Sequence, residues 1–130
     1  MTFDNSIKTC LSNSFTFAGR ASRSEYWYFT LFALLLALVG ILLHLVIEDN
    51  YYWGLNPDII NIATLIIMVL CGLCLIPASI SVTVRRFHDI NRSGWNLWWG
   101  IIPYIGSLIV LFFMVQPSQA GNNQYGSMPE

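Results

Sequence analysis

Charged residues are scarce in this sequence. Asp, Glu, Lys and Arg together make up 10% of its 130 residues, whereas a soluble domain usually carries about 25%. The shortage is concentrated in three long stretches that contain none of these four residue types, and hydrophobic residues make up 55% of the chain. This pattern excludes an ordinary soluble domain and is typical of segments that face lipid.

Other absences restrict the possible functions. Lys and Arg number 6 against 7 Asp and Glu, so the net basic surface of a nucleic-acid-binding protein is missing. The three cysteines Cys10, Cys71 and Cys74 are too few and too deeply placed for a secreted disulfide framework. His88 and Asp89 alone fall short of a usual set of metal ligands, so we expect no metal and no cofactor. The first 25 residues also lack the apolar stretch of a cleavable signal peptide.

The three uncharged stretches predict an all-α integral membrane protein whose single membrane domain covers residues 1–130. About 20 helical residues cross the hydrocarbon layer of a bilayer, and each stretch is at least that long. The predicted transmembrane helices cover about residues 27–47, 59–84 and 95–115. Pro77 predicts a kink, a tilt or an extension of the second span. Gly100, Pro103 and Gly106 weaken the third span, for which a re-entrant segment is the alternative.

Two further segments lie outside the predicted spans. Residues 1–22 predict a short amphipathic helix on the cytoplasmic surface, and residues 116–130 form a polar tail. Four apolar residues recur at helical spacing in the first of these segments: Phe3, Ile7, Leu11 and Phe15.

The basic residues predict the orientation in the membrane. All six lie before the first span or between the second and third: Lys8, Arg20, Arg23, Arg85, Arg86 and Arg92. The positive-inside rule therefore places the N-terminus and the second loop in the cytoplasm of a bacterial inner membrane, and three crossings place the tail outside. Aromatic clusters mark the predicted interfaces at Tyr26–Tyr28, Tyr51–Trp53 and Trp95–Trp99.

Two polar motifs stand at the predicted cytoplasmic face. Ser22 and Glu25 have the spacing of a helix capping box, and Arg85–Asp89 closes the second span with an Arg-Arg-x-His-Asp sequence. Antiparallel spans bring both motifs to one depth, so we expect a single site in which Glu25 and Asp89 pair with arginines, Glu25 with Arg86 among them. The surplus positive charge suits lipid phosphate or an acidic partner. The candidate lipid- or partner-binding residues are Arg20, Arg23, Glu25, Arg85, Arg86, His88, Asp89 and Arg92. The alternative is that the arginines serve topology alone.

Small residues form a stripe along the second span: Cys71, Cys74, Ala78 and Ser81. Such stripes allow close helix packing in lipid. The Cys-x-x-Cys spacing also fits a redox motif, but no charged residue near Cys71 and Cys74 in sequence lowers their thiol pKa.

Several of these blocks together resemble the domain of unknown function 805 family, over nearly the whole chain. They are Gly19–Trp27, Arg85–Asp89, Ser93–Trp95, Ile102–Gly106, and a tail pattern G-x-N-x-Y-G-x-x-P that starts at Gly121. The family commonly has Leu at position 87 and Arg at position 124, where this chain has Phe87 and Gln124. The resemblance implies a small bacterial inner-membrane protein whose biochemical role is not established.

The favoured function is a non-catalytic accessory or interaction module that packs with a membrane-protein partner or with itself, and that binds lipid headgroups. An oligomeric transport or channel component is the alternative, although the spans lack the intramembrane charges of an ion route. A lipid-phosphate enzyme is a third possibility, with His88, Asp89 and Glu25 as acid-base groups.

Overall fold

The computed structural model describes residues 1–49 and 57–129. The regular secondary structure of this part is all helical, apart from one isolated bridge between Asn123 and Gly126. The helices are α1 (Phe3–Ser12), α2 (Arg23–Asp49), α3 (Pro57–Asp89), the 3-10 helix η2 (Gly94–Ile101) and α4 (Ile105–Val115). The all-α prediction is thus confirmed.

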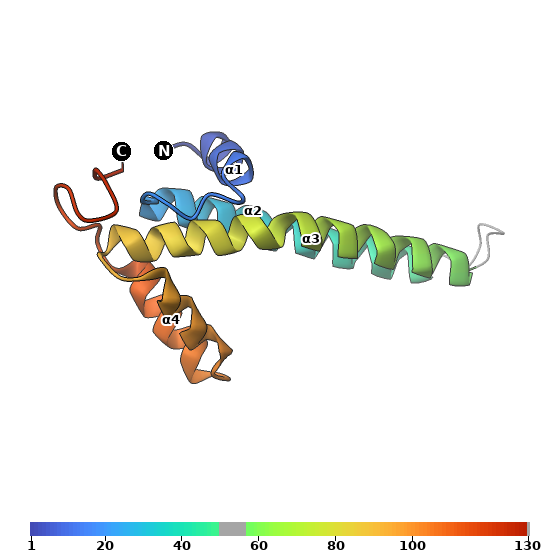
Figure 1. The fold of residues 1–130 in the computed structure, drawn as a ribbon. Coiled ribbons are helices and arrows are strands. Elements are labelled where there is room, and N and C mark those ends of the chain that lie inside the picture. Colours follow the sequence, from blue (N-terminus) through green and yellow to red (C-terminus); the bar gives the residue numbers. More distant parts are fainter. Residues whose placement is uncertain (50–56, 130) are drawn as a thin grey trace.

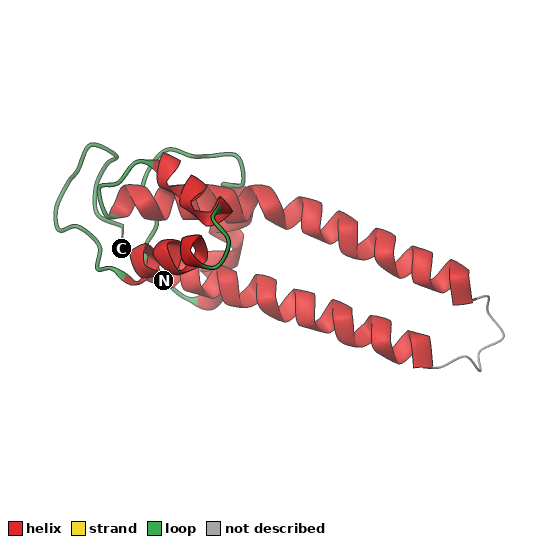
Figure 2. Ribbon diagram, turned by 90° about the horizontal axis from the view of Figure 1, so that it is seen from below, coloured by secondary structure: helices red, strands yellow, loops and turns green. Residues whose placement is uncertain are grey.

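Two long helices form the body of the molecule. α2 has 27 residues and α3 has 33, which correspond to roughly 40 Å and 50 Å. Both are long and apolar enough to cross a membrane, as predicted for the first two spans. They run side by side in opposite directions, and the rest of the chain gathers at one end of this pair (Figure 1 and Figure 2). The predicted aromatic cluster at Tyr51–Trp53 lies outside the described residues.

The third predicted span is a helical hairpin instead of one continuous helix. Pro103 follows η2 and lacks the N–H that helix continuation needs, and Tyr104 takes a left-handed conformation with φ +62°. The chain turns back there, and η2 and α4 pack against each other: a Cβ atom on Gly100 would lie 3.9 Å from the Val110 side chain. A Cβ atom on Gly106 would lie 1.9 Å from the Trp99 carbonyl oxygen, so only glycine fits. The prediction of three transmembrane helices is not confirmed, and the re-entrant alternative agrees with this geometry.

The predicted N-terminal helix is present, but its buried face differs from the predicted stripe. α1 packs on α2 and α3 and buries Ser6 and Cys10. Phe3, Leu11 and Phe15 are exposed instead. Phe3 still packs edge to face on Tyr28, with ring centroids 5.9 Å apart, so the chain covers only part of the apolar stripe.

The small-residue stripe of α3 is only half buried. Ala78 and Ser81 are fully covered, and the Ser81 hydroxyl donates to the carbonyl oxygens of Asn13 and Thr16 at 2.7 and 2.6 Å. Cys71 and Cys74 are exposed. Within one chain, the stripe thus packs α1 and the α1–α2 linker against the C-terminal half of α3, and the cysteines lie beyond this contact.

Candidate functional site

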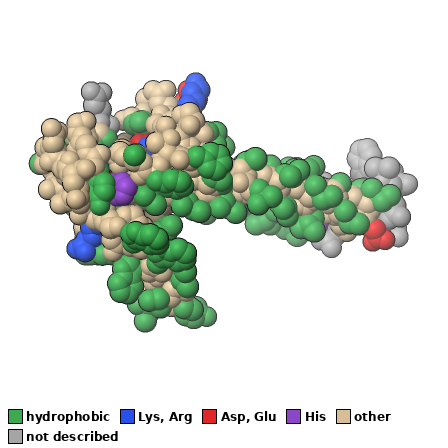
Figure 3. Space-filling view, in the orientation of Figure 1, with side chains coloured by type: hydrophobic (Ala, Val, Ile, Leu, Met, Phe, Trp, Pro, Cys, Tyr) green, Lys and Arg blue, Asp and Glu red, His purple; other side chains and the backbone are tan. Residues whose placement is uncertain are grey.

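A buried charge cluster lies at the end of the body where α2 begins and α3 ends. It consists of Arg20, Glu25, Arg85, Arg86 and Asp89, all of which are at most 8% exposed. The structure brings together the two polar motifs, as the sequence predicted, because α2 and α3 are antiparallel. In Figure 3 the visible Lys and Arg side chains lie near this end, while hydrophobic side chains cover the rest of the body.

Glu25 connects the first turn of α2 to α3. The Ser22 hydroxyl accepts from the Glu25 N–H at 3.2 Å, which is one half of the predicted capping box. The Glu25 carboxylate pairs with Arg85 instead of reaching back to the helix start, with 2.7 Å between Oε1 and Nη1. The predicted pairing of Glu25 with Arg86 is therefore wrong. Adjacent positions on a helix point about 100° apart, and Arg85 is the one that faces α2.

Asp89 is the acceptor at the centre of the cluster. Its Oδ1 atom accepts from the Arg20 guanidinium, at 3.0 Å from Nε and 2.9 Å from Nη2. The carboxylate also pairs with the Arg86 guanidinium and accepts from the Ser118 hydroxyl. Three donors from different parts of the chain thus meet on one buried carboxylate.

The same arginines hold the C-terminal tail. Arg20 donates to the carbonyl oxygens of Gln119 at 2.6 Å and Gly121 at 2.7 Å, and Arg86 donates to that of Met114 in the last turn of α4 at 3.3 Å. The tail therefore lies at the same end as the N-terminus (Figure 2). The predicted placement of residues 116–130 across the membrane from residues 1–22 is wrong, because the third segment turns back.

His88 fixes the tail from the other side. Its imidazole stacks on Tyr125 with ring centroids 3.8 Å apart, and its Nδ1 lies 3.2 Å from the Gly19 carbonyl oxygen. Because a carbonyl only accepts, Nδ1 is the protonated nitrogen. The Asn123 side chain donates to the His88 carbonyl at 2.8 Å. The tail pattern quoted for the family resemblance thus contained these contact residues, although sequence reasoning assigned them no role.

Arg23 and Arg92 differ from the cluster because both are exposed. The Arg92 guanidinium lies 4.8 Å from the centre of the Phe113 ring. Since Arg20, Arg85 and Arg86 are buried and used within the chain, Arg23 and Arg92 are the candidate arginines that remain accessible to headgroups. Headgroup binding stays a prediction.

Three guanidinium groups and two carboxylates leave the buried cluster with one excess positive charge. The excess lies at Asp89, which pairs with both Arg20 and Arg86, whereas Arg85 and Glu25 pair one to one. Within residues 1–49 and 57–129, the Nε and Nη2 atoms of Arg85 are nevertheless buried without a hydrogen-bond partner. The same described ranges contain no group of three His, Cys, Asp or Glu side chains placed to hold a metal ion.

Cys10 borders the cluster and supplies a testable consequence. Its thiol lies 3.7 Å from Glu25 Oε1, and burial together with that carboxylate raises the Cys10 pKa to about 12 from an ordinary 9.0. In a Cys71→Ala, Cys74→Ala background, we expect Cys10 to react with N-ethylmaleimide at pH 8 about a thousandfold more slowly than in the unfolded chain, because the thiolate is the nucleophile. A mass-spectrometric time course measures this rate.

The sign of the pH effect on stability follows from the same pKa. The folded chain holds the Cys10 proton more tightly than the unfolded chain, so this contribution to stability is complete below pH 9 and is lost as the pH rises towards 12. Equal labelling rates of folded and unfolded protein at pH 8 would contradict the buried thiol.

Comparisons with known proteins agree with the sequence resemblance. A family model described as "Protein of unknown function (DUF805)" matches residues 14–127. "Inner membrane protein YhaI" of Escherichia coli is 35% identical over 121 residues, which cover 92% of this chain and 91% of the relative. "Inner membrane protein YhaH" of the same species is 32% identical over 120 residues, with 92% of each chain covered. No solved structure matches the chain.

Proposed function

The chain belongs to the DUF805 family of proteins of unknown function, and from its geometry we propose that it is a non-catalytic interaction module of the bacterial inner membrane. In this proposal the charge cluster and the tail lock one end of the α2–α3 pair. The exposed apolar surface of that pair meets a partner helix within the membrane.

One observation carries the non-catalytic assignment: the candidate acid-base groups are engaged inside the chain. Asp89 accepts from Arg20, Arg86 and Ser118, and Glu25 accepts from Arg85. Both carboxylates are at most 3% exposed. A general acid or base must reach a substrate proton, and these two are directed at arginines instead. Their role is therefore to join chain segments.

The proposed topology has two crossings, with both termini in the cytoplasm. Roughly 20 residues of α3 suffice to cross the hydrocarbon layer, and the remaining dozen or so at its C-terminal end are those that α1, the linker and the tail cover. The positive-inside rule places that end in the cytoplasm. An acidic side chain is visible at the opposite end of the body in Figure 3.

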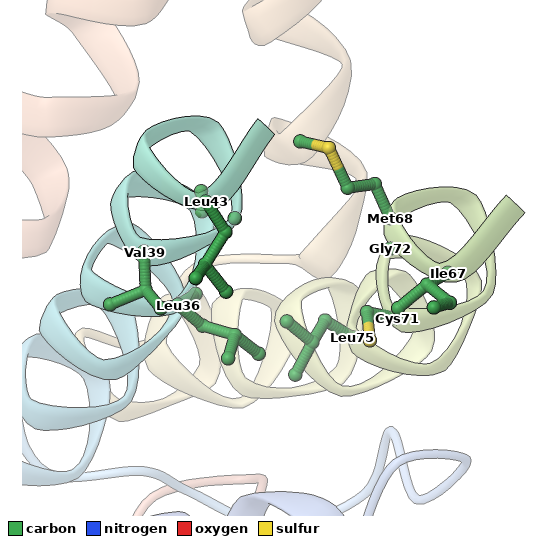
Figure 4. A pocket seen from close by; sticks show the side chains of 11 residues that line it. Leu36, Val39, Leu43, Ile67, Met68, Cys71, Gly72 and Leu75 are labelled. Carbon is green, nitrogen blue, oxygen red and sulfur yellow. The ribbon is translucent and has the colours of Figure 1, made fainter. Parts of the chain in front are cut away.

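The proposed docking surface is an apolar groove between α2 and α3, with a volume of about 260 Å³. In Figure 4, Leu36 and Leu75 extend towards one another across it. Five of its eleven lining residues are small: Ala33, Ala37, Gly40, Cys71 and Gly72. Small residues let helix backbones approach closely in lipid, so an apolar transmembrane helix is the partner that this groove fits. A second copy of the chain or another membrane protein supplies such a helix.

Filling the groove tests this function. A Cβ atom on Gly72 meets nothing within 4 Å, so the backbone of α3 has room for a side chain at this position, and Gly72→Leu adds volume in the groove. We expect this variant to fold normally. The amount of partner that copurifies with it in mild detergent should fall at least about tenfold. Quantitative mass spectrometry of copurified proteins measures the loss and distinguishes a second copy from another protein.

The matched control is Ala63→Leu, which adds the same side chain to α3 at an exposed position outside the groove. It should retain the partner. Full retention by the Gly72→Leu variant, or equal loss in both variants, would contradict the groove as the docking surface.

A further inference from the structure

The hairpin formed by η2 and α4 exposes a large apolar surface. Its turn is largely uncovered, with Ile101 67%, Tyr104 88% and Ile105 64% exposed. Further large side chains on both helices are more than one third exposed: Trp95, Trp98, Trp99, Leu108, Leu111 and Phe112. A surface of this kind is unfavourable in water, because the free-energy cost of exposing apolar area grows with that area.

The sequence around the hairpin contains no charge to keep it in water. No Asp, Glu, Lys or Arg occurs from residue 93 to residue 129. Arg92, at the base of the hairpin, is the last basic residue and is exposed. A stacked pair of Trp95 and Trp98 follows it, with ring centroids 6.4 Å apart. Such a succession from Arg through Trp to aliphatic residues is that of a segment entering a bilayer from the headgroup layer.

Several polar backbone groups at the turn have hydrogen-bond partners inside the hairpin. The Ile102 N–H donates to the Trp99 carbonyl at 3.1 Å, and the Gly106 N–H donates to the Ile102 carbonyl at 3.0 Å. The Ser107 hydroxyl donates to the Tyr104 carbonyl at 2.8 Å, and Pro103 has no N–H to satisfy. Non-helical backbone enters hydrocarbon at low cost only when its polar groups have partners, and these internal hydrogen bonds reduce the number of groups that would need one.

The length of the hairpin limits how far it reaches. η2 has 8 residues and α4 has 11, so each arm is roughly 16 Å long. That is about half of the ~30 Å hydrocarbon thickness. Both arms are attached at the charge-cluster end: η2 follows α3 after a short loop, and the last turn of α4 is held there because Arg86 of α3 donates to the Met114 carbonyl oxygen. In Figure 1 the hairpin slants away from the body on the side opposite α1.

We infer that the η2–α4 hairpin inserts into the leaflet on the charge-cluster side, with lipid hydrocarbon as its occupant and with a tip no deeper than the middle of the bilayer. The assignment of that leaflet as cytoplasmic rests on the proposed topology. The hairpin therefore displaces lipid from one leaflet only, whereas α2 and α3 displace it from both.

Spin labels test the depth of the hairpin in the full-length protein. Cysteine is introduced as Ile102→Cys, Leu38→Cys or Ser127→Cys in the Cys71→Ala, Cys74→Ala background, and the protein is reconstituted into phosphatidylethanolamine and phosphatidylglycerol vesicles. Collision rates with oxygen and with a water-soluble nickel complex are then measured. We expect the ratio of oxygen to nickel collisions at position 102 to exceed that at position 127 severalfold and not to exceed that at position 38, in the middle of α2.

Three outcomes would overturn this inference. Nickel access at position 102 equal to that at 127 would place the hairpin in water. Spin–spin broadening at 102 with loss of oxygen access would place a second copy on it. Labelling of a Tyr104→Cys variant by an impermeant maleimide from the side opposite the N-terminus would show a full crossing. Should a variant fail to fold, quenching of Trp95, Trp98 and Trp99 by brominated lipids in a Trp27→Phe, Trp53→Phe protein gives the depth instead. None of these results depends on the Gly72→Leu association test.

Discussion

Replacing Asp89 by Asn is expected to destabilise the folded protein by about 3–5 kcal/mol, which is the typical cost of removing one partner from a buried ion pair. The substitution keeps the shape of the side chain and removes its charge. Arg20 and Arg86, whose side chains are 1% and 0% exposed, then share a dry site without their counter-ion. Because both also hold the tail, we expect the tail to detach together with the loss of stability.

Reversible unfolding in mixed detergent micelles measures the free energy, and limited proteolysis between residues 116 and 128 reports the tail. Asp4→Asn is the matched control: Asp4 pairs with Lys8 at 2.7 Å, but both side chains are 72% exposed. Solvent screening limits such a pair to less than about 1 kcal/mol. A change below about 1 kcal/mol for Asp89→Asn would show that the cluster does not hold these segments together.

The two long helices were predictable because their signal is simple. Long windows without a charged residue leave few structures other than helices in lipid. The third segment has the same composition and a length that fits a crossing, yet it folds as a hairpin. Its outcome depends on local backbone chemistry at Pro103 and on the contact of Gly106 with Trp99, which hydropathy does not measure. The error in the tail position follows from this one, because topology is counted from the number of crossings.

For the charge cluster, the sequence predicted that the two polar motifs lie close together. It did not correctly predict which carboxylate pairs with which arginine. Antiparallel packing of α2 and α3 brings Glu25 near both Arg85 and Arg86, but side-chain direction on the helix decides between them. The buried face of α1 was missed for a related reason. Periodicity selected Phe3 and Leu11, whereas Ser6 and Cys10 are buried, because a close contact with α3 at Ala78 favours small side chains over large ones.

The glycines and the tyrosine of the tail pattern, which the sequence left without a role, form contacts with the charge cluster. Gly121 and Gly126 adopt φ of +73° and +127°, a region that favours glycine, and both carbonyls accept from Arg20. Tyr125 covers His88. These residues serve to close the charge cluster, which explains why a polar tail carries such specific spacing although it lies outside the spans.

A double-mutant cycle on Glu25 and Arg85 is expected to show coupling above about 1.5 kcal/mol. Glu25→Gln leaves Arg85 with its buried charge and without the carboxylate at 2.7 Å, and its Nε and Nη2 atoms already lack partners in the described part of the chain. Arg85→Gln leaves the Glu25 carboxylate with the Cys10 thiol, a weak donor at 3.7 Å. The double variant removes both charges, so its loss should be much smaller than the sum of the two single losses.

The control cycle pairs Glu25→Gln with Arg86→Gln in the same unfolding assay. Arg86 neighbours Arg85 in sequence and is also buried, but it pairs with Asp89. Its coupling to Glu25 should therefore stay below about 0.5 kcal/mol. Equal coupling in both cycles would mean that Glu25 interacts with the summed charge of the two arginines and not with one partner. Coupling with Arg86 alone would reverse the assignment of partners. In either case Arg85 would no longer be the residue that ties α3 to the first turn of α2.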